Sequence, residues 1–206
     1  MKRAAILFLL ALPQEAAWKD LFNGKDLEGW ATVGSAKWKV EDGVLVGGQD
    51  GDPKRSGVIH TKDAFQDFEF SLEFMIDEHG KYNSGIFIRN DAGRGGQSTY
   101  QINIGRAEAG EFTAGVVVHR DRKVLWLAKG DEKDEVRKKL DWNSMKVLAK
   151  GAHVEVELNG KKVSDCTDPA PPARFLEKGV IAIQTYGAEG HAGWIKLRNL
   201  KIRELK

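Results

Sequence analysis

The feature that most constrains the fold is an alternation in the segment 68–76, where Glu69, Ser71 and Glu73 stand between large apolar side chains. Every second position there carries a large apolar residue, namely Phe68, Phe70, Leu72, Phe74 and Ile76. Successive side chains of a β-strand point to opposite faces of its sheet, so this two-residue period is typical of a strand with one buried face. The segments 85–90 and 100–104 are predicted to be the next strands. In the second of them, Gln101 and Asn103 lie opposite the apolar face.

Turn signals divide the rest of the chain into further short strands. Asp42-Gly43 and Asn159-Gly160 each stand between alternating apolar runs, and such pairs supply the positive φ angles of a tight hairpin turn. Apolar residues that fall out of step around Arg198-Asn199 predict a β-bulge. The one segment that could be helical is 131–139, whose mixed charges indicate an exposed turn or a short helix. An all-β sandwich or barrel in one domain is therefore expected.

The amino-terminal residues predict an export signal. A positively charged start, Met1–Arg3, precedes an apolar run at 4–12 that is too short to anchor in a bilayer. We expect cleavage near residue 17, which leaves 18–206 as a mature domain in the periplasm or outside the cell. Cys166 is the only cysteine, so no intramolecular disulfide can form. No later segment is apolar and long enough to cross a membrane.

The charge pattern narrows the class of partner. The formal net charge is +2, and both signs are mixed along the chain. A nucleic-acid partner is not expected, because phosphate binding needs a concentrated basic footprint. The polar pair Gln101 and Asn103 favours a sheet face that binds something. An ordinary solvated face of an antiparallel sheet is the alternative.

A series of motifs resembles a known family. They are FNGKDLEGW, W-x-V-x-DG-x-L, DFEFSLEF followed by NSGIFIR, Trp142-Asn143, LNG at 158–160, and GVIAIQ followed by IKLRNLKI. In this order they resemble the 3-keto-disaccharide hydrolase domain family, over residues 18–205. That resemblance implies a concanavalin A-like lectin/glucanase fold, which is an all-β, two-sheet antiparallel jelly-roll sandwich.

The resemblance also implies a chemistry. Glycosides oxidised at C3 by a separate oxidoreductase would be cleaved by an exported enzyme of hydrolase or lyase type. The ketone acidifies the C2 proton, the resulting enolate expels the group on C1, and water adds. This route needs a base, a group that stabilises the enolate oxygen and a proton source. The resemblance leaves open a divalent metal ion as cofactor, although no metal ligands are predicted.

The chain departs from the family pattern at two sites. Where the family usually has Tyr-Glu-x-Gln-Ile, this chain has Tyr100-Gln101-Ile102-Asn103-Ile104. Where the family usually has Leu-Gln-x-His-Gly, residues 183–187 read Ile-Gln-Thr-Tyr-Gly, with Tyr186 in place of the histidine. A carboxylate and an imidazole are thus replaced where chemistry is expected. These departures favour the alternative function, a non-catalytic carbohydrate-binding module of the lectin type.

Candidate site residues follow from side-chain chemistry. His119, at a strand end, is the first candidate for the base because imidazole titrates near neutrality. His191 is the second, and Arg89 is the candidate clamp for the enolate oxygen or a sugar hydroxyl. For each of them a structural role is the alternative. The substrate-binding candidates are Gln101, Asn103, Gln184, Tyr186 and Trp194, with Trp30 as a further aromatic that could stack on a sugar. The sugar hypothesis expects Arg89 to lie beside Gln101 and Asn103.

Overall fold

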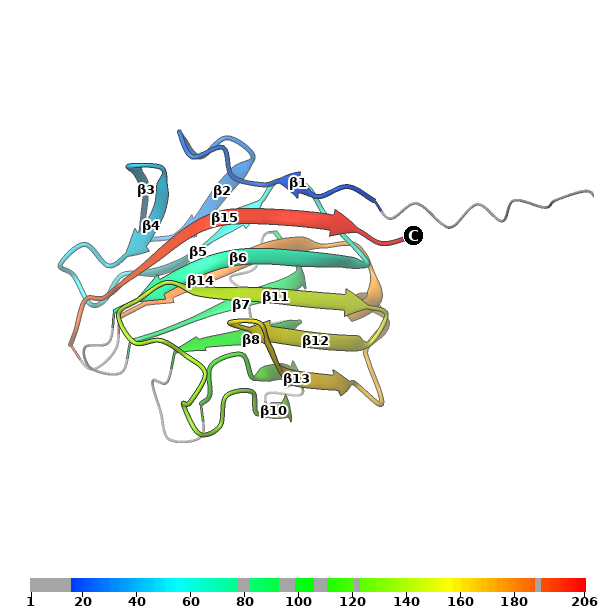
Figure 1. The fold of residues 1–206 in the computed structure, drawn as a ribbon. Helices are drawn as coiled ribbons and strands as arrows, with labels where there is room; N and C mark the ends of the chain where they lie inside the picture. Colours follow the sequence, from blue (N-terminus) through cyan, green and yellow to red (C-terminus); the bar gives the residue numbers. More distant parts are fainter. Residues whose placement is uncertain (1–15, 78–81, 93–98, 106–110, 121–122, 188–189) are drawn as a thin grey trace, which may run out of the picture.

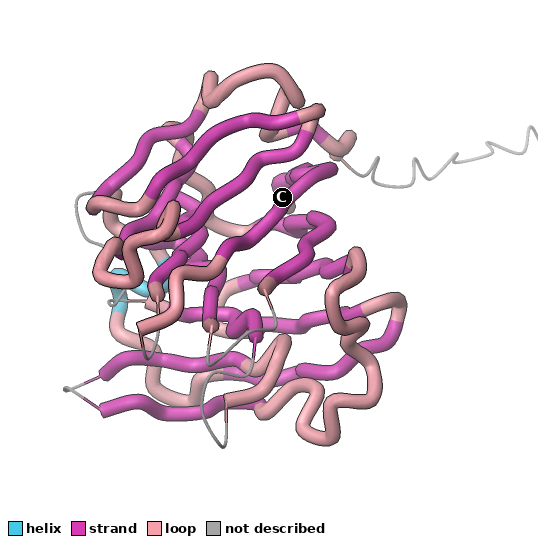
Figure 2. Tube along the Cα trace, turned by 90° about the vertical axis from the view of Figure 1, so that its left-hand side faces the viewer, coloured by secondary structure: helices cyan, strands magenta, loops and turns pink. Residues whose placement is uncertain are grey.

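The structure is a computed structural model, and two antiparallel sheets packed face to face make up its fold (Figure 1). It describes residues 16–77, 82–92, 99–105, 111–120, 123–187 and 190–206. The predicted two-sheet antiparallel sandwich is confirmed. Figure 2 shows the two layers from the side, with strands in nearly all of the layered part.

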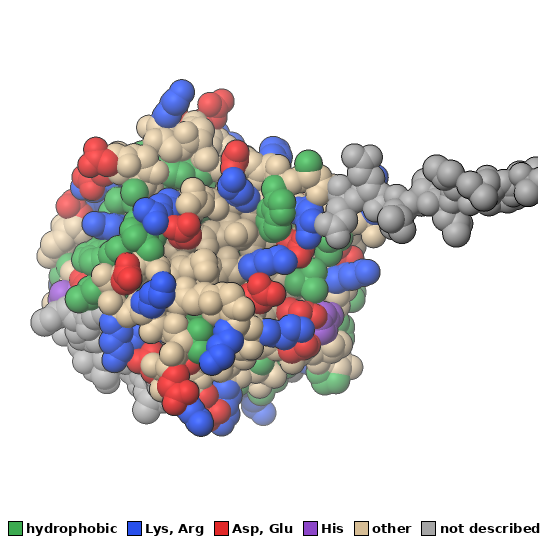
Figure 3. Space-filling view, in the orientation of Figure 1, with side chains coloured by type: hydrophobic (Ala, Val, Ile, Leu, Met, Phe, Trp, Pro, Cys, Tyr) green, Lys and Arg blue, Asp and Glu red, His purple; other side chains and the backbone are tan. Residues whose placement is uncertain are grey.

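The first sheet is centred on the strand that carries the alternating pattern. Its order is β13 (Lys161–Thr167), β12 (His153–Leu158), β11 (Asn143–Lys150), β6 (Phe68–Ile76), β15 (Trp194–Glu204), β4 (Val44–Gly48) and β3 (Lys37–Glu41), and the short β1 (Lys19–Asp20) also pairs with β15. Its outer face carries acidic and basic side chains that alternate in space (Figure 3). Glu69, for example, lies between Lys146 and Arg203.

The second sheet carries the segments on which the functional prediction depends. Its order is β10 (Lys123–Ala128), β9 (Val116–Arg120), β8 (Tyr100–Gly105), β7 (Asn83–Asn90), β14 (Val180–Tyr186), β5 (Ser56–Thr61) and β2 (Trp30–Gly34). The core lies between the two sheets. Phe68, Phe70 and Phe74 are fully buried in it together with Ile102 and Ile183. Each large apolar side chain buried in this way contributes about 1.5–3 kcal/mol.

Local backbone geometry confirms the predicted turns and bulge. Asp42 and Asn159 have φ angles of 50° and 51°, and a glycine with positive φ follows each of them. The pairing of β15 with β6 shifts register between Arg198 and Lys201, and Asn199 has a φ of 55°. The extra residue restores the apolar face of β15, so that Leu197, Leu200 and Ile202 are all buried.

The segment 131–139 forms turns instead of a helix. The Asp131 carboxylate accepts hydrogen bonds from the backbone N–H groups of Glu135, Val136 and Arg137, at 3.0, 3.1 and 2.9 Å. An aspartate that binds nearby backbone donors competes with helical hydrogen bonding, so the exposed-turn interpretation holds. The one helix among the described residues is the 3₁₀ helix η1 (Ala173–Leu176), which follows two prolines.

The predicted export signal lies almost wholly outside the described residues, and so does its apolar run at 4–12. It stays a prediction. Within the described residues, no helix has the length and apolar character needed to cross a membrane.

Candidate functional site

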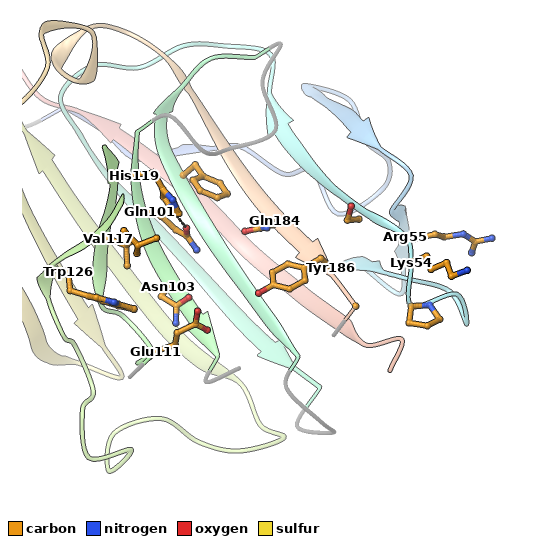
Figure 4. Close-up of a pocket in the computed structure, with 15 residues that line it drawn as sticks. Lys54, Arg55, Gln101, Asn103, Glu111, Val117, His119, Trp126, Gln184 and Tyr186 are labelled. Carbon is orange, nitrogen blue, oxygen red and sulfur yellow. Dashed lines mark hydrogen bonds between the residues drawn. The ribbon is translucent and has the colours of Figure 1, made fainter. Parts of the chain in front are cut away.

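A pocket of about 490 Å³ opens on the outer face of the second sheet, and Figure 4 shows it in close-up. Side chains from β7, β8, β9, β10 and β14 line it, and residues 53–56, which lead into β5, form one rim. The core-facing residues Tyr100, Ile102 and Ile104 alternate along β8 with Gln101 and Asn103, which point into the pocket. The polar pair of this strand therefore faces a cavity.

The register of the sheet gathers three amide side chains. Gly85 on β7 is paired with Asn103 on one side and with Gln184 on the other, and Phe87 is paired with Gln101. Gln101, Asn103 and Gln184 all line the pocket, and Tyr186 lies two residues beyond Gln184 on the same face. The structure thus brings four of the five substrate-binding candidates into one cavity.

His119 joins them through a hydrogen bond to Gln101. Its Nε2 atom lies 3.2 Å from Oε1 of Gln101. The carbonyl oxygen of the amide accepts, so Nε2 carries the proton and Nδ1 keeps its lone pair. Burial lowers the pKa of His119 below its usual value, because desolvation disfavours the imidazolium. The ring is therefore neutral at pH 7, which is the state that a general base needs.

The amide of Asn103 is held in one orientation. Its Nδ2 atom donates to the backbone oxygens of Gly105 and Phe112, at 3.1 and 3.2 Å. Because both amide hydrogens serve these carbonyls, Oδ1 is the atom that Asn103 can offer to a ligand. Gln101 presents the opposite chemistry, because its Oε1 accepts from His119. Its Nε2 has no hydrogen-bond partner among the described residues and can donate to a ligand oxygen. A donor and an acceptor thus stand side by side on β8.

The prediction that Arg89 lies beside Gln101 and Asn103 is wrong. Two residues of β7 oppose one of β14 where the register shifts between Val180 and Ala182, and Arg89 has a φ of 55°. This bulge turns the Arg89 side chain away from the pocket, and only 2% of the residue is exposed.

The guanidinium of Arg89 is saturated by structural partners. It donates to the backbone oxygens of Gln66, Gly151 (2.7 Å) and Phe175 (3.1 Å), and to Oδ1 of Asp67 at 2.9 Å. These contacts join β7 to three other segments of the chain. Arg89 therefore fixes the fold and does not take part in the pocket.

Two other candidates also lie elsewhere. His191 does not line the pocket, and its Nε2 lies 3.1 Å from Oδ2 of Asp77. Trp194 stands on the outer face of the first sheet, where the ammonium of Lys196 lies 5.0 Å from its ring centroid. Trp30 is a core residue whose Nε1 donates to the Leu21 carbonyl at 2.7 Å.

The pocket also contains residues that the sequence did not point to, chiefly Trp126, Glu111 and Lys54. Trp126 is paired with Val117 across β9 and β10, so it faces the same side as Gln101. Strand alternation counted from His119 could have placed it there.

The loop that brings Lys54 to the pocket is a self-contained turn. Its Asp52 accepts a hydrogen bond from the Lys54 backbone N–H at 3.0 Å, and Arg55 donates to Asp50 at 3.2 Å. The two aspartates thus serve contacts within the loop, which agrees with a plain solvated loop.

The described part of the pocket does not fit a metal centre. Glu111 and His119 are the only described carboxylate or imidazole side chains that line it, and no described cysteine does. One group of metal-ligating type is found among the described residues, formed by His153, Glu155 and Asp165 on β12 and β13. Lys162 lies 2.7 Å from Glu155 and 3.1 Å from Asp165, so an ammonium already balances one of the two carboxylate charges of this group.

Comparison with known proteins supports a link to carbohydrate chemistry. A family model described as a 3-keto-alpha-glucoside-1,2-lyase-like domain matches residues 17–203. A search of curated proteins found no match.

The fold also matches solved structures. Two proteins of Parabacteroides distasonis, each provisionally described as a glycosyl hydrolase, are similar at 21% and 29% identity, with TM-scores of 0.67 and 0.65. The alignments cover 92% of this chain in both cases, and 94% and 100% of those chains. A Bacillus subtilis protein with a galectin-like fold aligns at 16% identity over 93% of this chain and 97% of its own, with a TM-score of 0.70. The likenesses at 21% and 16% identity concern the fold alone.

Proposed function

Because the chain belongs to the family of 3-keto-alpha-glucoside-1,2-lyase-like domains, we propose that it cleaves 3-keto-glycosides by elimination at C1 and C2 followed by addition of water. The observation that carries this proposal is the pair formed by His119 and Gln101 inside the pocket. A neutral imidazole and an amide donor are the two groups that the first step needs.

The first step removes the C2 proton. Nδ1 of His119 takes this proton, and the electron pair of the C–H bond becomes the enolate of C2 and C3. The Nε2 hydrogens of Gln101 donate to the developing enolate oxygen. An aligned donor at such an oxygen contributes about 10²–10³ in rate. The hydrogen bond from Nε2 of His119 to Oε1 of Gln101 couples the two groups.

The second step breaks the glycosidic bond. The enolate electrons form the C1–C2 double bond, the C3 ketone returns, and the C1–O bond breaks with its electrons on the leaving oxygen. That oxygen takes the proton held on Nδ1 of His119 and departs as an alcohol, which returns the imidazole to its neutral state. Water then adds across the double bond, its oxygen to C1 and a proton to C2, so that the net reaction is hydrolysis. Oδ1 of Asn103 and the amide of Gln184 are suited to hold sugar hydroxyls meanwhile.

The decisive experiment distinguishes this enzyme from a non-catalytic carbohydrate-binding module. The departures from the family pattern at Gln101 and Tyr186 favour the binding module. The mature chain is incubated with 3-keto-trehalose, with and without chelator, and the loss of the ketoside is followed by NMR. We expect turnover that His119→Ala lowers by about 10²–10⁴-fold, the usual contribution of a general base. His153→Ala, on the outer face of β12, serves as the matched control.

Three outcomes are informative. An unchanged rate in His119→Ala would show that another group is the base. Saturable binding of the ketoside without any turnover would establish the binding module instead. Loss of turnover in the presence of chelator would show that the reaction depends on a metal ion. Residues beyond the described lining of the pocket would then have to help hold that ion.

We also propose that the chain is exported and works in the periplasm or outside the cell, and that a separate oxidoreductase supplies the C3 ketone. The motivation is the charged start and apolar run at 1–12. Expression of the full chain in a bacterium, followed by fractionation and amino-terminal sequencing, tests this. A mature chain that begins near Trp18 is expected, whereas an intact Met1 in the cytosolic fraction would contradict it.

A further inference from the structure

The pocket has two chemically different halves. Amide side chains from β8 and β14 form one half, and apolar side chains from β9 and β10 form the other. The second half, called the apolar patch below, consists of Val117, Val124 and Trp126. Figure 4 shows Val117 and Trp126 on the side of Gln101 that lies away from Gln184.

Within the apolar patch Val124 is exposed, Val117 is buried at 3%, and Trp126 is held in place. Val124 is 55% exposed, an unusual state for a strand valine inside a lined cavity. A Cβ at Gly115 would lie 2.5 Å from Cζ3 of Trp126, so the indole lies directly over this glycine. On another side the ring of Phe112 contacts it, with centroids 6.3 Å apart. Contact of the exposed Val124 side chain and the immobilised indole with water is unfavourable. A bound apolar group would remove this apolar surface from water and so gain binding free energy.

The proposed chemistry fixes which part of the substrate reaches this patch. In the sugar ring C2 lies between C1 and C3. If His119 on β9 takes the C2 proton and Gln101 on β8 holds the C3 oxygen, C1 and its substituent point away from β8. That direction leads to β10, where Val124 is paired with His119 and Trp126 with Val117.

We infer that the apolar patch binds an aromatic aglycone on C1, so that the preferred substrates are 3-keto-glycosides of an aromatic alcohol. This inference rests on the proposed function and names its substrate class. A second sugar fits the patch less well, because the two valines offer no hydrogen-bond partner and hydroxyl groups buried against them would lose their water.

The test compares glycosides whose leaving groups have the same acidity. The 3-keto-glucosides of 2-phenylethanol and of ethanol both expel a simple primary alcohol and differ in a phenyl ring. We expect kcat/KM to be about tenfold higher for the phenylethyl compound, from burial of the ring. Val124→Ser should bring this ratio close to one. Leu125→Ser is the matched control, since Leu125 is 41% exposed on the opposite face of β10 and should leave the ratio unchanged.

A ratio near one in the native protein, or a high ratio that Val124→Ser does not lower, would overturn the inference while leaving the proposed function intact. If no ketoside is consumed, the proposed function fails, and calorimetry decides the inference separately. The unoxidised phenylethyl and ethyl glucosides are then titrated into the native protein and into Val124→Ser. Tighter binding of the phenylethyl compound that is lost in Val124→Ser supports the patch, and equal binding overturns it.

Discussion

A Cβ atom on Gly85 would lie 2.4 Å from Nε2 of Gln101, so the glutamine side chain occupies the space directly above this glycine. Cγ and Cδ of Gln101 would also be only 3.0 Å away. The glycine sits mid-strand, where it sacrifices side-chain packing. Glycine at this position of β7 therefore leaves the space in which the Gln101 side chain lies flat between Asn103 and Gln184.

Gly85→Ala is expected to lower activity without unfolding the protein. The new methyl group pushes Gln101 aside, and a displacement of about 1 Å at a catalytic group can cost about 10²-fold in rate. Stability should stay the same or rise slightly, because alanine restricts the unfolded chain. Steady-state kinetics and urea unfolding measure the two effects.

The matched control for this variant is a double-mutant cycle. In a Gln101→Ala background the clash disappears, so Gly85→Ala should cost nothing further. If the losses of activity from Gly85→Ala and Gln101→Ala simply add, Gly85 does not act by leaving space for the Gln101 side chain.

Gln101→Glu should move the pH profile. In the native protein burial lowers the pKa of His119, so the acid limb of kcat/KM lies below about 6.5, the ordinary histidine pKa. A carboxylate in place of the Gln101 amide, 3.2 Å from Nε2, would favour the imidazolium and raise the pKa of His119. The acid limb then moves to higher pH by a similar amount.

The free energy of unfolding of Gln101→Glu should also depend on pH, in the direction set by the raised pKa of His119. A raised pKa of His119 adds stability below the pKa of the unfolded state, and the gain is lost as pH rises through the folded value. Gln184→Glu adds the same charge to the pocket without a hydrogen bond to His119 and should shift the limb less. Titration of the His119 ring protons by NMR provides the direct check. An acid limb that moves equally in both variants would argue against a specific pair.

Strand alternation predicts much of this site but not all of it. The two-residue period identified the strands and placed Gln101 and Asn103 on a non-core face, because that period is a local property of the chain. Arg89 was misplaced because a bulge opposite Val180 and Ala182 turns its side chain inward, and such a bulge depends on pairing with a strand far along the sequence. Trp126 was overlooked although alternation across the hairpin of β9 and β10 places it on the same face as His119.

Cys166 is expected to be a slow nucleophile in the folded protein. Burial, with the charges of Asp165 and Asp168, raises the pKa of its thiol to about 11. At pH 8 about one molecule in a thousand then carries the reactive thiolate. Alkylation by iodoacetamide should therefore be at least about tenfold slower than in urea. Asp165→Asn, which removes a neighbouring charge, should speed it modestly, whereas equal rates in the folded and unfolded protein would mean that β13 opens readily.

Arg89→Met tests the structural role assigned to Arg89. The substitution leaves the carbonyls of Gly151 and Phe175 without the Arg89 donor. The Asp67 carboxylate loses one of two donors and keeps the hydrogen bond from the Gly151 backbone N–H. Each buried carbonyl that loses its donor costs about 1–3 kcal/mol, whereas Asp67, whose side chain is 35% exposed, can be solvated. The control is Arg198→Met, whose side chain is 40% exposed and pairs with Glu73 on the surface, so that a loss of about 1 kcal/mol or less is expected. Urea unfolding measures both free energies, and kcat/KM per folded molecule should stay unchanged in Arg89→Met. A large fall in kcat/KM with little loss of stability would instead return Arg89 to the reaction, through a movement of β7 that brings its guanidinium toward Gln101.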